Sequence, residues 1–188
     1  MERNAQNLPK GCVCRKNFIN SEKKGKKMIL VLLGTQNNDF SRLLREIEIC
    51  IDSKVIHEDV IVQAGFTKFE TKKMKIFDMI PKEELKELVE EANIVISHGG
   101  IGSIQMALEA GKKVIAVPRK SEFGEHVNNH QSQIVKNFND NGYLIGIENL
   151  ENLKDAIREI ENRNFKKYIK EKSRIIEVIE KFIEEKVK

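Results

Sequence analysis

No apolar run in this 188-residue sequence approaches the roughly 20 residues that a membrane-spanning helix needs. The longest run, residues 28–33, has only the length of a strand. The N-terminus also lacks the apolar segment of a secretory signal. These absences argue against a secreted or membrane-spanning protein. The composition, 40% hydrophobic and 33% charged, is typical of one globular domain with a well-hydrated surface.

Cysteine is also scarce, and its three positions form no recognisable framework. Cys12 and Cys14 are one residue apart, and Cys50 stands alone. No further Cys or His cluster lies beside the first pair, whereas a structural zinc site needs about four ligands. We therefore expect free thiols in a reducing compartment and no bound metal.

The net charge of +4 is confined to the N-terminus. Residues 1–27 hold eight Lys or Arg against two Glu, and the remainder holds 25 basic and 27 acidic residues. A nearly neutral body argues against nucleic acid as a partner. Residues 1–27 show no apolar periodicity, so we predict a disordered basic leader that is not part of the functional protein, which would begin at Met28. The alternative is a basic tail that holds the protein near anionic lipid.

From Met28 onward, strand-like and helix-like segments alternate. The predicted strands are residues 28–33, 60–63, 75–80, 94–97, 114–117 and 143–147, and the predicted helices are 40–51, one opened by Pro81, one ending before Gly111, 128–138, 151–161 and 164–186. This alternation predicts an α/β fold, a single Rossmann-like, doubly wound parallel sheet. We assign residues 28–161 to the domain and 162–188 to a C-terminal helix that docks on it or on a partner.

The most informative motif is Ser97-His98-Gly99-Gly100-Ile101-Gly102-Ser103, between a predicted strand and a predicted helix. Glycines allow close approach of backbone to a ligand, and the first N–H groups of a helix lack internal partners. Such a turn can hold a diphosphate without a protein cation. The alternative is a turn that only packs strand against helix. No Gly-Lys-Ser/Thr follows, so it is not a P-loop.

Two other polar segments follow predicted strands. Residues 118–131 contain two histidines, two asparagines, a glutamine and two glutamates, and residues 34–39 read Gly-Thr-Gln-Asn-Asn-Asp. Side chains of these kinds can bind sugar hydroxyls or a base. The alternatives are a solvated loop and an ordinary turn with a helix cap. His126 and His130 lack the Glu that follows the first His in the zinc-protease motif, which argues against a metal site.

Taken together, these motifs resemble the C-terminal, donor-binding domain of glycosyltransferase family 28. Within it, the sequence looks like the PssE-type small subunit of two-component exopolysaccharide or capsule glycosyltransferases, and it is similar to the cytosolic subunit of the eukaryotic dolichol-linked N-acetylglucosaminyltransferase. The motifs that carry the resemblance are Gly34-Thr35-Gln36, Phe40-x-Arg42-Leu43, 97–103, Gly111-Lys112-Lys113, Val117-Pro118-Arg119 and Gly124-Glu125-His126-Val127-x-x-His130-Gln131.

The resemblance implies one half of a GT-B enzyme, with a UDP-sugar as donor substrate and no cofactor or metal. It implies inversion at the anomeric carbon and a membrane-anchored, acceptor-binding partner subunit that presents a polyprenyl-diphosphate-linked sugar. The chain would then lie in the cytoplasm, peripheral at the inner face of the plasma membrane through its partner. Galactose, in a β-1,4 linkage, is the first expectation for the sugar, followed by glucuronate and N-acetylglucosamine. A non-catalytic sugar-nucleotide-binding or scaffold subunit is the alternative function.

The resemblance also nominates site residues. The expected donor-binding residues are Gly34, Thr35, Gln36, His98, Gly99, Gly100, Gly102, Ser103, Glu109, Arg119, Glu125, His126, Asn129, His130 and Gln131. Met106 stands where the family places a ribose-binding Glu, so Glu109 is expected to substitute for it or the ribose is held otherwise. His98 is a candidate general base, with a structural histidine as the alternative. An NAD enzyme is disfavoured, because no Gly-x-Gly-x-x-Gly follows the first strand.

Overall fold

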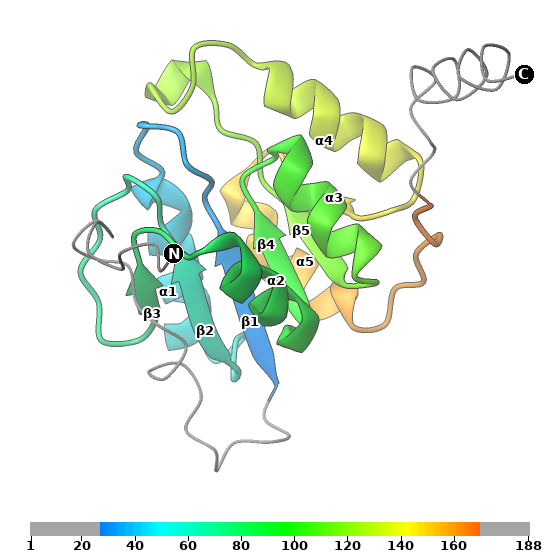
Figure 1. Cartoon of the computed structure of the whole chain (residues 1–188), viewed down its shortest axis with the longest axis horizontal. Coiled ribbons are helices and arrows are strands. Elements are labelled where there is room, and N and C mark those ends of the chain that lie inside the picture. The colour runs from blue at the N-terminus through cyan, green and yellow to red at the C-terminus, as the bar shows by residue number, and fades with distance from the viewer. Residues whose placement is uncertain (1–26, 170–188) are drawn as a thin grey trace, which may run out of the picture.

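The computed structural model describes residues 27–169, in which strands and helices alternate along the chain (Figure 1). The strands are β1 (Met28–Leu32), β2 (Asp59–Gln63), β3 (Lys75–Phe77), β4 (Ile94–Ser97), β5 (Lys113–Ala116) and β6 (Ile145–Gly146). The helices are α1 (Ser41–Asp52), α2 (Lys82–Glu91), α3 (Ile101–Glu109), α4 (His130–Asp140) and α5 (Leu153–Ile160), with short 3₁₀ helices η2 (Ser121–Phe123) and η3 (Leu150–Asn152).

The six described strands form one parallel sheet in the order β3-β2-β1-β4-β5-β6. This order confirms the predicted doubly wound, Rossmann-like fold. The chain runs outward from β1 to β3, then returns to β4 on the other side of β1. The carboxyl ends of β1 and β4 are therefore the topological switch point, where open α/β sheets bind ligands.

Helices cover both faces of the sheet, so its central strands are apolar on both sides. In β1, Ile29 and Val31 belong to the apolar cluster that includes α1 and α5, whereas Leu30 and Leu32 belong to the cluster that includes α2 and α3. Figure 1 shows α2 and α3 in front of the sheet and α5 behind it. Burial on both faces explains why β1 reads as a continuous apolar run and not as an alternating pattern.

The two edge strands are shorter than predicted. Residues 75–80 form a strand only over Lys75–Phe77, and residues 143–147 only over Ile145–Gly146. Each edge strand is paired on one side alone, so fewer ladder bonds hold it. The helix predicted for 128–138 begins two residues later, at His130, where the Asn128 side-chain oxygen accepts a hydrogen bond from the His130 N–H.

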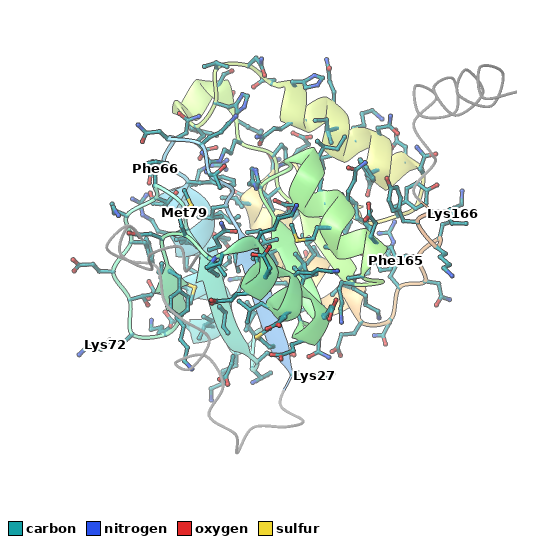
Figure 2. The ribbon with its side chains drawn as sticks, viewed as in Figure 1. Lys27, Phe66, Lys72, Met79, Phe165 and Lys166 are labelled. Carbon is teal, nitrogen blue, oxygen red and sulfur yellow. The ribbon has the colours of Figure 1, made fainter. Side chains whose placement is uncertain are left out.

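The helix predicted to start at residue 164 is wrong over its described part, because residues 163–169 are not helical. Tertiary contacts hold this segment instead: the Lys166 N–H donates to the Gly142 carbonyl, and the Tyr168 ring packs against Phe138 and Tyr143. Figure 2 shows Phe165 and Lys166 of this segment at the margin of the molecule. The rest of the predicted helix, residues 170–186, and residues 1–26 of the predicted leader lie outside the described residues.

Candidate functional site

The candidate site lies at the switch point, between the loop after β1 and the loop after β4 (upper edge of the sheet in Figure 1). Leu32 of β1 and Ser97 of β4 are paired neighbours, so the two loops leave the sheet side by side. Both segments contain glycines that the sequence analysis singled out, and the topology brings them together. The third segment, residues 118–131, follows β5, the next strand along the sheet.

The N-terminus of α3 is open to solvent at this edge. Gly100 precedes the helix, and no side chain caps it. Within residues 27–169, a β-carbon added at Gly102 would meet no atom within 4 Å outside its own stretch of helix, and Ile101 and Gly102 are both exposed. The first-turn N–H groups of α3 therefore have room for an anion, in the region of positive potential that a helix N-terminus creates.

His98 is packed between the two loops. The residue is only 9% exposed, and Nδ1 lies 3.0 Å from the Leu32 carbonyl oxygen. A carbonyl can only accept, so we assign the proton to Nδ1, which leaves Nε2 as the acceptor. A β-carbon at Gly34 would lie 2.6 Å from Nε2, and one at Gly100 would overlap the same atom. The ring thus fits only because both loops carry glycine at the contact.

Burial lowers the pKa of His98 from its ordinary value to about 4, with a smaller lowering from the positive charge of Arg119 and a partial opposition from the Leu32 hydrogen bond. The ring is therefore neutral at physiological pH and is a weak base. These properties favour the structural role over the general base that the sequence also allowed. They leave Nε2 free to act as a hydrogen-bond acceptor.

This pKa predicts an acid sensitivity of the fold. The folded pKa of His98 lies below the unfolded value of about 6.5, so between pH 6.5 and 4 the unfolded chain binds a proton that the folded chain excludes. The free energy of unfolding should fall as the pH is lowered through this window, by up to about 3 kcal/mol from this group. Urea unfolding at a series of pH values measures that slope.

Two variants identify the histidine responsible. His98→Asn should flatten the pH dependence of the unfolding free energy by about one proton. The exposed His57 provides the control, and His57→Asn should keep the wild-type slope. Equal slopes in the two variants would refute the assignment to His98.

Besides His98, three of the predicted donor-binding side chains lie inside the protein. Arg119 is 0% exposed, Glu125 is 4% exposed and Gln131 is buried, with its Oε1 atom 3.0 Å from the Arg119 backbone N–H that donates to it. Burial lowers the pKa of the Arg119 guanidinium, and the Glu125 and Asp39 charges oppose that effect. Arg119 and Glu125 thus both make hydrogen bonds within the protein.

The other side chains nominated for donor binding differ in their exposure to solvent and in their place in the fold. Thr35 and Gln36 after β1, and Asn129 and His130 at the start of α4, are exposed, whereas Ser103 and His126 are half-buried. Glu109 is the last residue of α3, so it lies about 10 Å along the helix axis from Gly102. The structure therefore separates Glu109 from the glycine loop, at the opposite end of the same helix.

Sequence reasoning about single motifs missed the role of Arg42. Its guanidinium makes two hydrogen bonds to the Glu125 carboxylate, of 2.8 and 2.9 Å, and lies 4.4 Å from the centre of the Phe123 ring. Beside this pair is a cavity of about 470 Å³, lined by α1, η2 and the segment after β6. The motif Phe40-x-Arg42-Leu43 was the available signal, but it gave no partner for the arginine.

Several apolar side chains are exposed along the same carboxyl edge. They are Phe66 after β2, Ile101 after β4, and Phe123 and Val127 after β5. Figure 2 labels Phe66 at the periphery of the molecule. Exposed apolar groups that gather along one edge favour a surface on which another polypeptide packs.

Residues 27–169 contain neither a metal-site cluster nor a membrane-spanning helix. No group of three or more His, Cys, Asp or Glu side chains there has the arrangement of a metal site. No helix in this range is both long enough and apolar enough to cross a bilayer.

Comparison with solved structures supports the fold. The crystal structure of Methanocaldococcus jannaschii UDP-GlcNAc 2-epimerase in complex with UDP-GlcNAc and UDP has a TM-score of 0.58 and 18% identity, and covers 82% of this chain and 45% of that one. The glycotransferase of kitacinnamycin has a TM-score of 0.54 and 19% identity, over 87% of this chain and 40% of that one. At these identities the likeness shows the fold alone.

Comparison with curated proteins and families is more specific. The human UDP-N-acetylglucosamine transferase subunit ALG13 is 38% identical over 63 residues, which are 34% of this chain and 5% of that protein. The UDP-N-acetylglucosamine--N-acetylmuramyl-(pentapeptide) pyrophosphoryl-undecaprenol N-acetylglucosamine transferase of Clostridium tetani is 28% identical over 203 aligned positions. That alignment covers 88% of this chain but only 52% of the relative.

The family model covers most of the chain. It is the model of the glycosyltransferase family 28 C-terminal domain, and it matches residues 28–185. It therefore spans every described strand and helix, including the glycine loop and the segment after β5. The chain belongs to the glycosyltransferase family 28 C-terminal domain family.

Proposed function

We propose that this chain is the UDP-sugar-binding subunit of a two-component, inverting glycosyltransferase that acts on a polyprenyl-diphosphate-linked sugar. The observation that carries the proposal is the open N-terminus of α3 at the switch point, with free space beside Gly102. That position suits the diphosphate of a sugar nucleotide, and the family of the chain supports this ligand.

In this proposal each loop has a separate task. The backbone N–H groups of Gly100, Gly102 and Ser103 bind the diphosphate, with Gly99 allowing its close approach. When the sugar bond breaks, negative charge grows on the departing UDP, and the positive end of α3 stabilises it without a metal or another cofactor. His126, Asn129 and His130 bind the sugar or the nucleoside, and the buried Gln131 holds the Arg119 backbone next to them. Thr35 and Gln36 lie on the facing side.

The proposal requires a second subunit. The chain spans about half of the Clostridium relative, and another relative, ALG13, is by its name a transferase subunit. The exposed apolar side chains at the carboxyl edge, Phe66, Ile101 and Val127, suit a surface that a partner covers. We propose that this partner is membrane-anchored, binds the acceptor, and holds the chain at the cytoplasmic face of the membrane. The PssE type, with galactose as the transferred sugar, is the specific version of this proposal.

Ligand-dependent melting tests the donor site directly. The purified chain is melted with UDP and with UDP-galactose, UDP-glucuronate and UDP-N-acetylglucosamine. A ligand at about 100 times its Kd should add about 2.7 kcal/mol to the free energy of unfolding. GDP-mannose is the control and should give no shift. If no UDP compound raises the melting temperature, the donor-site proposal is wrong.

Reconstitution separates a catalytic from a non-catalytic subunit. Sugar transfer to a lipid-linked acceptor is measured with the partner alone, with this chain alone, and with both. We expect transfer only with both. Full transfer by the partner alone would leave this chain a scaffold or accessory binding subunit.

A further inference from the structure

Arg119 is a buried charge that is hydrogen-bonded mainly to backbone. Its NH2 atom donates to the Leu33 carbonyl at 2.7 Å, and its NH1 atom donates to the Asn38 carbonyl at 2.7 Å. These carbonyls stand at the beginning and near the end of the loop after β1. The guanidinium also lies 5.3 Å from the centre of the Phe40 ring. The Arg119 side chain, on the loop after β5, thus holds the loop after β1 at two points.

Burying this charge has a large desolvation cost, which an apolar residue of the same size would avoid. Within residues 27–169 the guanidinium donates to the backbone carbonyls of Leu33, Asn38 and Glu125 and to no carboxylate, and its Nε atom has no partner there. Core packing alone therefore does not account for an arginine here. The shape of the guanidinium accounts for the arginine, because its NH1 and NH2 atoms donate to two loop carbonyls in a fixed geometry.

Glu125 fixes the other loop. Its Oε2 atom accepts from the Lys120 N–H at 3.0 Å, and the Glu125 N–H donates to the Lys120 carbonyl at 3.2 Å, so residues 120–125 close on themselves. The same carboxylate binds Arg42 of α1 through both oxygens. Both of its oxygens are occupied within the protein, and the residue is 4% exposed.

We propose that Arg119, Glu125 and Arg42 form a loop clamp that positions the loop after β1 against the loop after β5. The clamp sets the shape of the donor crevice, and none of the three side chains touches the donor. This inference rests on the proposed function, since it explains how that crevice is held ready for a ligand. It assigns Arg119 and Glu125 as positioning residues, in place of the donor contacts expected from the sequence.

A double-mutant cycle distinguishes positioning from contact. The Kd values of UDP and of UDP-galactose are measured for Arg42→Gln, Glu125→Gln and the double variant. Each single change should weaken both ligands by about 10-fold, since a charged hydrogen-bonded pair is lost. The double variant should be no weaker than either single one, because both remove the same pair. Arg45→Gln, an exposed arginine on the same helix, is the control and should bind as the wild type does.

A direct contact from Glu125 to the sugar gives another pattern. Glu125→Gln would then weaken UDP-galactose but not UDP, and its effect would add to that of Arg42→Gln. This result would overturn the clamp.

Arg119→Lys tests the contacts between Arg119 and the loop after β1. Lysine keeps the positive charge but loses the planar pair of donors, so the Kd of UDP should rise by about 10-fold. Wild-type affinity in a folded Arg119→Lys protein would also overturn the proposal.

Hydrogen exchange tests the clamp in the absence of a ligand. Backbone amides of residues 34–39 and 120–125 should exchange faster in Arg42→Gln and Glu125→Gln than in wild type, whereas those of β1 and β4 should not change. If the wild-type chain binds neither UDP nor UDP-galactose, the proposed function fails. The hydrogen-exchange rates then decide by themselves whether the clamp exists. Unchanged exchange in both loops would overturn it.

Discussion

Gly102→Val should abolish UDP binding while the protein stays folded. The residue is the second of α3, is exposed, and has no atom within 4 Å of an added β-carbon. Valine in a helix is no worse than glycine, so the melting temperature should stay within a few degrees of wild type. The isopropyl group would fill the space beside the first-turn N–H groups. We expect the Kd of UDP to rise by about 100-fold or more, a loss of about 2.7 kcal/mol of binding free energy.

Isothermal titration with UDP, together with thermal melting of the same preparation, measures both quantities. Gly111→Ala is the matched control, because it changes a glycine at the far end of α3, where an added β-carbon also meets no neighbour. It should bind UDP as the wild type does. Retained UDP affinity in a folded Gly102→Val protein would show that the diphosphate does not rest on this helix.

Gly65→Ala should instead destabilise the fold. Gly65 has a φ of +62°, a left-handed conformation that costs an L-residue about 1–2 kcal/mol. A β-carbon there would also overlap the carbonyl oxygen of Gly34, which is backbone and cannot rotate away. The two effects together should lower the free energy of unfolding by about 3 kcal/mol, or the melting temperature by about 10 °C.

The same Gly111→Ala control separates these two causes. Gly111 has a φ of +69° but open space around it, so alanine there should cost only the conformational part, about 1 kcal/mol. Urea unfolding followed by circular dichroism compares the two variants. Equal destabilisation would mean that the Gly65–Gly34 contact relaxes at no cost. A larger loss at Gly65 should come with weaker UDP binding, since Gly34 also packs against His98.

The amino-acid sequence by itself determined the order of the elements and the class of the fold. Apolar runs such as 28–33 and 94–97, the Pro before α2 with the acidic residues of its first turn, and the glycines between β4 and α3 are local signals, because strand burial and helix termini depend on near neighbours. Right-handed crossovers then leave few topologies for alternating strands and helices. The location of the candidate site at the carboxyl ends of β1 and β4 follows from that topology alone.

Only the tertiary structure decided what the polar side chains of the site do. Arg119 and Glu125 read as ligand-binding residues of a polar loop, yet Arg119 binds carbonyls 81 and 86 positions away and Glu125 pairs with an arginine 83 positions away. His98 is neutral because the folded chain buries it, and residues 163–169 are not helical because Gly142 and the Phe138 and Tyr143 rings hold them. Burial and long-range pairing depend on which distant segments come into contact, and local sequence patterns do not specify those contacts.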